Sequence, residues 1–360
     1  MPEASAARSP CENCGGTFVW DAASRKLRCA SCDELRDGPD PGIVLEHDLR
    51  DLLRANPHGR LGAGSEQVKC RDCGAEVELT EGQLAARCPF CASPQVLCAE
   101  ARSDRVQPES VIPFAITPAQ ARSAFATWLG RLWFRPLDLA TRSTVAELRG
   151  VYVPYWTFSA DVTSAWTADA GYRSSERVVI PRREVGKPRV RTVQHIRWKP
   201  ARGTRHDRHD DHLVCASAGL PDDQARSAAE SFDAGELVAF STDYLLGFSA
   251  ESYAVDLPEA WKRAQRDLAR LQQRRCAGDV PGDTHRGLRA SHRFDGVTVK
   301  LALVPLWIAA FRYRGRSHRF LVNGQSGEVA GAAPLSLPRI ALAVLAVAAL
   351  VLAAVVLLRR

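Results

Sequence analysis

Eight of the eleven cysteines stand in Cys-x-x-Cys pairs, a spacing that lets two thiolates reach one metal ion. Residues 11–32 and residues 70–91 share the pattern C-x2-C-x14-C-x2-C. The repeat predicts two zinc ribbons, each with a tetrahedral site filled by protein, so that each zinc is structural; iron is the alternative metal. The predicted ligands are Cys11, Cys14, Cys29 and Cys32 in the first ribbon and Cys70, Cys73, Cys88 and Cys91 in the second.

Three further cysteines, Cys98, Cys215 and Cys276, have no paired neighbour. An odd count combined with paired spacing argues against a disulfide framework and favours metal binding in a reducing compartment. The first ten residues, MPEASAARSP, contain no apolar core of a secretory signal. We therefore expect the ribbons to lie in the cytoplasm.

A second group of potential metal ligands is the histidine-rich run RHDRHDDH, which contains His206, His209 and His212. On a helix, this spacing could bring the three rings to one face and bind metal. However, Gly203 precedes the run and the apolar sequence LVCAS follows it. A solvated loop that leads into a strand is the favoured interpretation.

The region 182–208 is strongly basic, with ten Lys or Arg residues and apolar side chains interleaved among them. A strand of this composition could contact the phosphates of a lipid surface or of a nucleic acid. The alternative is the charged, solvent-facing side of a hairpin. The net charge of the chain is +7, which permits an anionic partner but does not require one.

Motifs of the common catalytic sites are missing from the sequence. It contains no G-x-x-x-x-G-K-[ST] phosphate loop, no G-x-S-x-G, no H-E-x-x-H and no kinase motif set. The adjacent acids Asp222 and Asp223 stand in polar surroundings that favour exposure. We therefore predict no catalytic residues, no organic cofactor, no small-molecule substrate and no enzymatic activity.

Helix-start and strand signals organise the rest of the chain of 360 residues. Thr117 to Gln120 forms a capping box, so a helix is expected to begin there and to end before Pro136. Asp256 opens a second polar helix, and residues 221–231 are expected to form a third. Apolar strands are predicted at 151–159, 188–198, 212–216, 301–313 and 317–322.

Two short segments resemble each other, Val153–Trp156 (VPYW) and Val304–Trp307 (VPLW). They suggest two related β-rich halves with antiparallel β-meanders, although coincidence is the alternative. The predicted fold class is multidomain: two small β zinc ribbons, an α+β domain and a C-terminal transmembrane helix. The predicted boundaries are 9–36 for ribbon 1, 37–66 for a linker with a short helix ending near Asn56, 67–100 for ribbon 2, 105–334 for the α+β domain and 339–359 for the transmembrane helix.

The C-terminal run Ile340–Leu358 contains 19 residues without a polar side chain. As a helix it would be about 28 Å long, close to the thickness of a bilayer core. Arg339 precedes the run, and Arg359 and Arg360 follow it. The run predicts a single-pass tail anchor in a bacterial inner membrane with the N-terminal domains in the cytoplasm; a buried core helix is the alternative.

The two ribbons, the segments GVYVPYWTFSA and VNGQSGEVAG, and the apolar tail together resemble a bacterial family of zinc-ribbon membrane proteins. Members are often labelled primosomal-helicase-like or TFIIB-type zinc-ribbon proteins. The helicase label does not carry over, because the chain lacks every motor motif. Some members look like anchors in membrane-stress modules. The resemblance implies a scaffold or adaptor with a phage-shock-A-type or SPFH-type protein partner. A membrane-tethered nucleic-acid-binding protein is the alternative.

Overall fold

The structure is a computed structural model of the chain. It describes residues 10–55, 67–70, 74–78, 88, 90, 96–99, 108–131, 136, 144–145, 148–180, 189–313, 316–331 and 336–358.

Within these residues the secondary structure consists of two sheets and a few helices. The small sheet has the order β1–β2–β3, with β1 (Phe18–Asp21), β2 (Lys26–Cys29) and β3 (Leu35–Arg36). The large sheet has thirteen strands: β4 (His47–Asp48), β5 (Gln67–Cys70), β6 (Glu76–Glu78), β7 (Val96–Ala99), β8 (Ser110–Val111), β9 (Thr144–Val145), β10 (Arg149–Ile180), β11 (Arg189–Cys215), β12 (Val238–Ala239), β13 (Ser249–Glu251), β14 (Thr284–Tyr313), β15 (Arg316–Asn323) and β16 (Val329–Gly331). The helices are α1 (Leu49–Ala55), α2 (Pro118–Arg131), α4 (Asp222–Glu230), α5 (Leu257–Asp279) and α6 (Leu337–Leu358), with short 3-10 turns η2 (Ala234–Glu236) and η3 (Thr242–Leu245).

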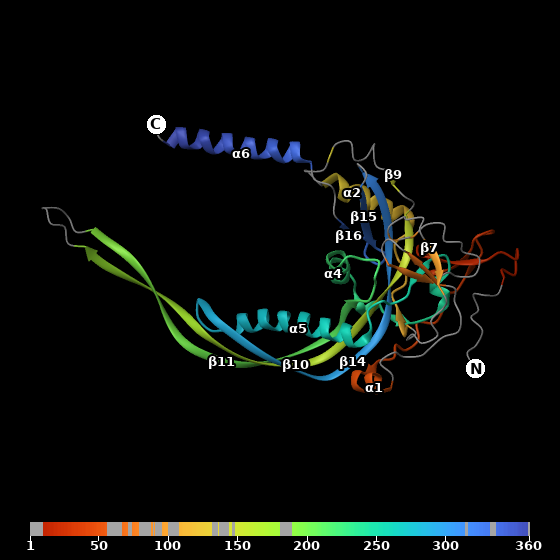
Figure 1. The fold of residues 1–360 in the computed structure, drawn as a ribbon, viewed down its shortest axis with the longest axis horizontal. Helices are drawn as coiled ribbons and strands as arrows, with labels where there is room; N and C mark the ends of the chain where they lie inside the picture. The colour runs from red at the N-terminus through yellow and green to blue at the C-terminus, as the bar shows by residue number, and fades with distance from the viewer. Residues whose placement is uncertain are drawn as a thin grey trace.

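Three very long strands dominate the large sheet. Strand β10 has 32 residues and pairs antiparallel with both β11, of 27 residues, and β14, of 30 residues. Near the start of β10 both faces of the sheet are buried, with Tyr152 in one apolar cluster and Val153 and Tyr155 in another. Beyond the point where β14 begins, β10 and β11 continue alone as a two-stranded ribbon that reaches away from the core (Figure 1).

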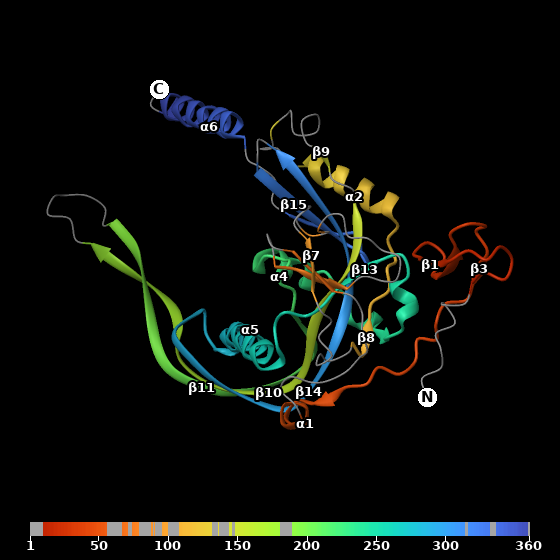
Figure 2. The same cartoon turned by 45° about the vertical axis from the view of Figure 1, so that its right-hand side comes forward.

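Helix α5 covers one face of the three long strands between the core and this ribbon (Figure 2). Its start is set locally, because the Asp256 side chain accepts a hydrogen bond of 3.1 Å from the backbone N–H of Glu259. Its buried side chains recur every three or four residues and meet the same face of β10 that carries Phe158 and Trp166. The buried side chains of α5 are Leu257, Ala260, Ala264, Leu268, Gln272 and Cys276.

The predicted helix starts are confirmed. The backbone N–H of Gln120 donates to the Thr117 hydroxyl at 3.3 Å, and the Gln120 amide oxygen accepts from the backbone N–H of Thr117 at 2.8 Å. This is the reciprocal capping box that the sequence indicates, and α2 begins there. The residues between Arg131 and Pro136, where this helix was expected to end, lie outside the described part.

The predicted fold class is wrong. The described chain is mostly β-structure, and β5, β6 and β7 from the second ribbon belong to the large sheet instead of forming a separate sheet. Strand β6 pairs with β13, with Glu251 opposite Val77. The two similar segments at Val153 and Val304 lie opposite each other in the adjacent strands β10 and β14.

The predicted histidine-rich loop is also wrong. Residues 188–198 and 212–216 were expected to be two strands separated by that loop, but β11 runs as one strand from Arg189 to Cys215. The pairing shifts register between Phe158 and Ala160 of β10, and on the β11 side Asp211 adopts a φ of +52°. This β-bulge accommodates an extra residue of the histidine-rich run without ending the strand. Long pairing with β10 therefore overrides the local loop signal.

The prediction of a transmembrane helix over 339–359 is corrected by the structure. Within the described residues, no helix is long and apolar enough to cross a membrane. The predicted tail anchor and the single-pass inner-membrane location with cytoplasmic N-terminal domains are corrected with it. Helix α6 stands apart from the sheet and exposes Leu342, Leu345 and Leu350 (Figure 1).

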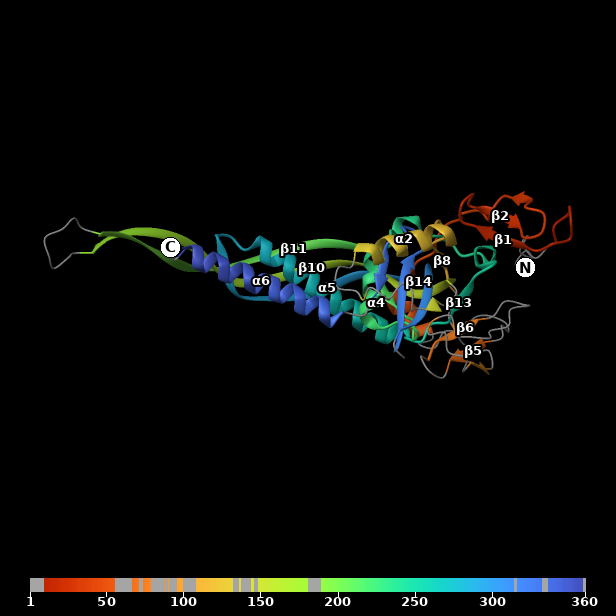
Figure 3. The same ribbon diagram turned by 90° about the horizontal axis from the view of Figure 1, so that it is seen from above.

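The small sheet and the ribbon tip lie at opposite ends of the molecule (Figure 3). At one end β1 packs beside η3, which holds Tyr244. At the other end only β10 and β11 remain. The metal-ligand candidates and the basic stretch are therefore separate features of the molecule.

Candidate metal centre and the exposed ribbon

Four cysteine sulfur atoms converge at the edge of the small sheet. The Sγ atoms of Cys11, Cys14, Cys29 and Cys32 all lie within 4.8 Å of one another. The Cys11–Cys32 and Cys14–Cys29 distances are 3.6 and 3.5 Å, far longer than a disulfide bond of about 2.05 Å. A tetrahedral zinc ion with Zn–S distances of about 2.3 Å separates its ligands by about 3.8 Å. The four thiols can thus hold one metal ion.

Local backbone geometry brings the first two cysteines together. The N–H of Gly15 donates to the carbonyl oxygen of Cys11 at 2.7 Å, and the N–H of Cys11 donates to Gly16 at 2.8 Å. Gly15 has a φ of +73°, which suits glycine. A Cβ on Gly16 would lie 3.1 Å from the Cys29 sulfur and 2.6 Å from the Ser31 hydroxyl. Gly15 and Gly16 therefore allow the two cysteine pairs to approach each other closely.

Hydrogen bonds among these thiols and to nearby backbone N–H groups shift the pKa values of Cys14 and Cys29. Backbone N–H groups of Ser31 and Cys32 lower the pKa of the Cys29 thiol to about 7. At Cys14 the Gly16 N–H lowers the pKa, but bonds to the Cys32 and Cys29 thiols outweigh it and raise it to about 12. Four thiolates at this spacing repel one another, so complete deprotonation requires a cation among them.

The second cysteine unit repeats the same turn. The N–H of Gly74 donates to Cys70 at 3.0 Å, the N–H of Cys70 donates to Ala75 at 2.9 Å, and Gly74 has a φ of +76°. Cys70 and Cys88 are buried in one apolar cluster with Phe90. The other two predicted ligands, Cys73 and Cys91, lie outside the described residues.

The four-cysteine cluster is attached to the large sheet through Trp20. Its indole N–H donates to the carbonyl oxygen of Phe114 at 2.9 Å, and its backbone N–H donates to Leu246 at 3.0 Å. The Trp20 ring packs edge-on against Tyr244. The sequence analysis did not identify Trp20. The sequence signal for it is a large aromatic residue in a zinc-ribbon unit that is too small to bury it.

The three unpaired cysteines are scattered. Cys98 lies on β7. Cys215 ends β11, where burial raises the pKa of its thiol to about 12. Cys276 is buried on α5. Among the described residues, the cluster formed by Cys11 and its three neighbours is the only group of three or more potential ligands close enough to hold a metal.

The three histidines of the run at 205–212 do not converge. His206 contacts the Thr163 hydroxyl through Nδ1 at 3.1 Å. His209, on the face toward α5, lies 2.9 Å from the Gln272 side chain, and burial lowers its pKa. Burial also lowers the pKa of His212. His209 therefore packs between β11 and α5, whereas His206 contacts β10, and the three rings form no ligand set among the described residues.

Ion pairs join β11 to α5 in the part of the sheet where β10 still pairs with β14. Arg205 contacts Asp207 at 2.6 Å and Asp279 at 2.8 Å, and Arg275 contacts Asp207 at 2.9 Å. Farther along the ribbon Arg173, Arg177, Arg197 and Lys199 are exposed, and none forms an ion pair with another described residue. The part of the predicted basic stretch at 182–188 lies outside the described residues.

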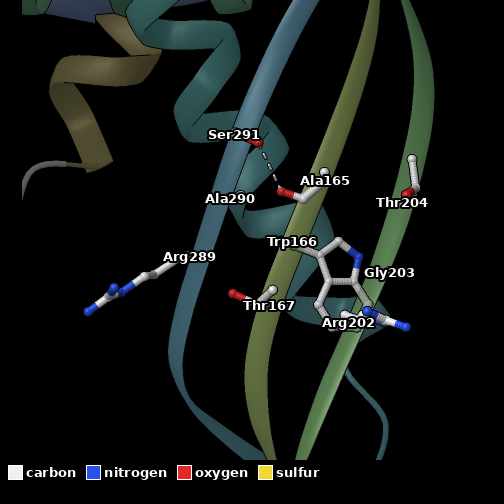
Figure 4. A pocket seen from close by; sticks show the side chains of 9 residues that line it. All are labelled: Ala165, Trp166, Thr167, Arg202, Gly203, Thr204, Arg289, Ala290 and Ser291. Atoms are coloured by element: carbon white, nitrogen blue, oxygen red, sulfur yellow. Dashed lines mark hydrogen bonds between the residues drawn. The ribbon is translucent and has the colours of Figure 1, made fainter.

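A shallow hollow of about 650 Å³ lies on the three long strands (Figure 4). The Trp166 ring lies against Gly203, where a Cβ would come within 2.5 Å of the indole. Arg202 and Arg289 point away from each other, so the hollow gathers no set of converging charged groups (Figure 4).

One uncharacterised protein is similar in sequence to this chain over most of its length. The uncharacterised protein YdjG of Bacillus subtilis (strain 168) is 26% identical over 335 residues, which cover 92% of this chain and 91% of that protein. No protein-family model matches the chain. No solved structure matches it either.

Proposed function

We propose that this protein is a zinc-stabilised scaffold or adaptor that holds a protein partner on the ribbon formed by β10 and β11. The observation that carries the proposal is the ribbon itself. It extends beyond the core as two strands with exposed side chains, and its cations lack ion-pair partners among the described residues (Figure 1). A two-stranded ribbon of this length gains little stability from its own packing, which favours a role in contacting another molecule.

The metal in this proposal is zinc, with two ions per chain. The thiolate-only ligand set of the first centre suits zinc, and the matching turn at Cys70 and Gly74 supports a second centre that includes Cys73 and Cys91. Both ions are structural, because four protein ligands leave no open position. Elemental analysis of protein purified without chelator should give two zinc ions; one or none would contradict the proposal.

The partner follows from the resemblance described above, which implies a phage-shock-A-type or SPFH-type protein. Affinity purification of the full chain tests this. A matched variant replaces residues 173–196 with Asn-Gly, joining the cross-strand partners Tyr172 and Arg197 through a two-residue turn. This variant should keep its zinc but lose the partner. Capture of the same partner by both proteins would contradict a role for the ribbon.

A nucleic-acid-binding protein is the second candidate, and the cations of β10 and β11 that have no ion-pair partner among the described residues favour it. An interaction with phosphates would be independent of partner protein and would weaken steeply with salt. Titration of the purified chain with duplex DNA between 50 and 200 mM salt separates the two candidates. Under either proposal the protein turns over no ATP, and DNA-stimulated ATPase activity that survives purification would contradict both.

A further inference from the structure

Strand β11 has one free edge. In the described part of the chain it pairs with β10 alone. Over 192–208 its backbone forms no other hydrogen bond to a described residue, and most of its side chains are exposed. At about 3.3 Å per residue this edge is about 55 Å long. An unpaired row of N–H and C=O groups of this length is a template for another strand.

Pro200 determines which backbone groups face that edge. It lies within β11, opposite Asp169, and the register between β10 and β11 is unbroken from His209 back to Arg189. Proline has no N–H, so it occupies a position whose backbone points away from the neighbouring strand. Positions of this kind alternate along an antiparallel ladder. The groups that face the free edge on the distal side of Pro200 therefore belong to Thr192, Gln194, Ile196 and Trp198.

The two faces of this edge differ in chemistry. Ile196 and Trp198 lie on one face, where a Cβ on Gly171 would come within 3.0 and 2.7 Å of them. Arg197 pairs with Tyr172 on the opposite face, and Lys199 lies 5.5 Å from the ring of Tyr172. The edge thus offers the apolar side chains of Ile196 and Trp198 on one face, with the Arg286 guanidinium 4.3 Å from the Trp198 ring, and a cationic strip on the other face.

We propose that an extended segment of the partner protein adds to β11 along 192–198 as a further strand. Its apolar side chains lie beside Ile196 and Trp198, and its alternate acidic side chains lie beside Arg197 and Lys199. This inference rests on the proposed scaffold function and defines the partner by its chemistry. Pro200 limits the docking run, because it interrupts the row of edge donors.

Charge selects this occupant over two others. A second copy of the chain would bring β11 edges together with cations opposite cations, which is destabilising in a strand pair. A nucleic acid would neutralise Arg197 and Lys199 but would leave the edge N–H groups without strand partners. A segment that alternates apolar and acidic side chains can hydrogen-bond to the edge backbone, pack on the apolar face and pair with the cations on the other face.

The test uses the full zinc-loaded chain and a ten-residue peptide of alternating Val and Glu, with a Val–Lys peptide of the same length as control. Gln194→Pro removes one edge donor and no bond to β10, whereas Gln194→Ala removes the same side chain and keeps the N–H. We expect Gln194→Pro to weaken binding at least tenfold and Gln194→Ala to leave it within twofold. Amide exchange at Gln194, Ile196 and Trp198 should slow at least tenfold in the complex.

Several results would overturn the inference. They are equal binding of the Val–Lys peptide, no effect of Gln194→Pro, binding without slower amide exchange, or a dimer in which these amides are already protected. Lack of peptide binding would also overturn it. The variant lacking 173–196 tests the scaffold proposal separately. If this variant loses the cellular partner while the peptide fails to bind, the scaffold proposal stands and only strand addition is overturned. If the variant keeps the partner, the scaffold proposal fails whatever the peptide does.

Discussion

The indole N–H of Trp20 donates a hydrogen bond of 2.9 Å to the carbonyl oxygen of Phe114, a residue 94 positions away. This bond joins the small sheet that carries the first four-cysteine cluster to the core of the large sheet. Phe114 in turn stacks on Phe248 and lies against Tyr152. The four-cysteine cluster and the main core therefore share one apolar cluster.

Trp20→Phe should destabilise the protein by about 2 kcal/mol. The change leaves a buried carbonyl without its donor and opens space beside Tyr244. Urea unfolding followed by far-UV circular dichroism measures the effect. Trp128→Phe is the control, because Trp128 is only half-buried on α2. Equal losses for the two variants would show that the bond to Phe114 contributes nothing specific.

Removal of the first metal should unfold the small sheet and leave the long strands in place. Cys29→Ser deletes one ligand of the four-cysteine site, and metal binding supplies much of the folding free energy of a small zinc-ribbon unit. We expect one metal ion fewer per chain and a change in Trp20 fluorescence. Cys276→Ser, at a buried thiol on α5, should leave the metal content unchanged. A Cys29→Ser protein with full metal content would contradict this ligand assignment.

Glu251 should make the protein less stable as the pH rises. Burial raises the pKa of its carboxyl to about 7, while Ala218 and Gly219 donate their N–H groups to one of its oxygens. The folded state then binds more protons than the unfolded state between about pH 4.5 and 7. Stability from this group is present below pH 4.5 and falls by about 3 kcal/mol as the pH rises through 7.

Glu251→Gln should remove that fall, because the amide keeps the acceptor oxygen and carries no charge. Urea unfolding at pH 5 and pH 8 measures the difference. The variant should gain stability relative to the natural protein mainly at pH 8. Glu176→Gln on the exposed ribbon is the control. A gain of the same size at both values of pH would rule out titration of Glu251 as the cause.

Lys300→Met should cost about 3 kcal/mol. The ammonium of Lys300 is buried and contacts Glu46 at 2.7 Å and Asp211 at 2.6 Å. Removing the cation leaves two carboxylates facing each other in a partly buried place. Lys26→Met breaks the exposed pair with Asp37 and should cost less than about 1 kcal/mol. Chemical unfolding of both variants decides whether burial gives the Lys300 pair its larger effect.

The sequence by itself determined the features that depend on near neighbours. The Cys-x-x-Cys turns form because Gly15 and Gly74 permit the backbone that brings sulfur atoms together. The helix starts at Thr117 and Asp256 follow from caps that reach only three residues along the chain. Interactions over this distance can be read from local spacing.

Only the tertiary structure decided how the strands extend and pair. Val153 lies opposite Val304, and the strands around them grow far beyond the predicted segments. The predicted loop at His206 to His212 became strand, and the second cysteine unit joined the large sheet. The strand predicted to end at residue 198 continues through Pro200, which lies inside β11 with its nitrogen toward a free edge. Strand pairing gains its free energy from residues distant in sequence, so one chain segment alone cannot specify the length of a strand or which of its edges stays open.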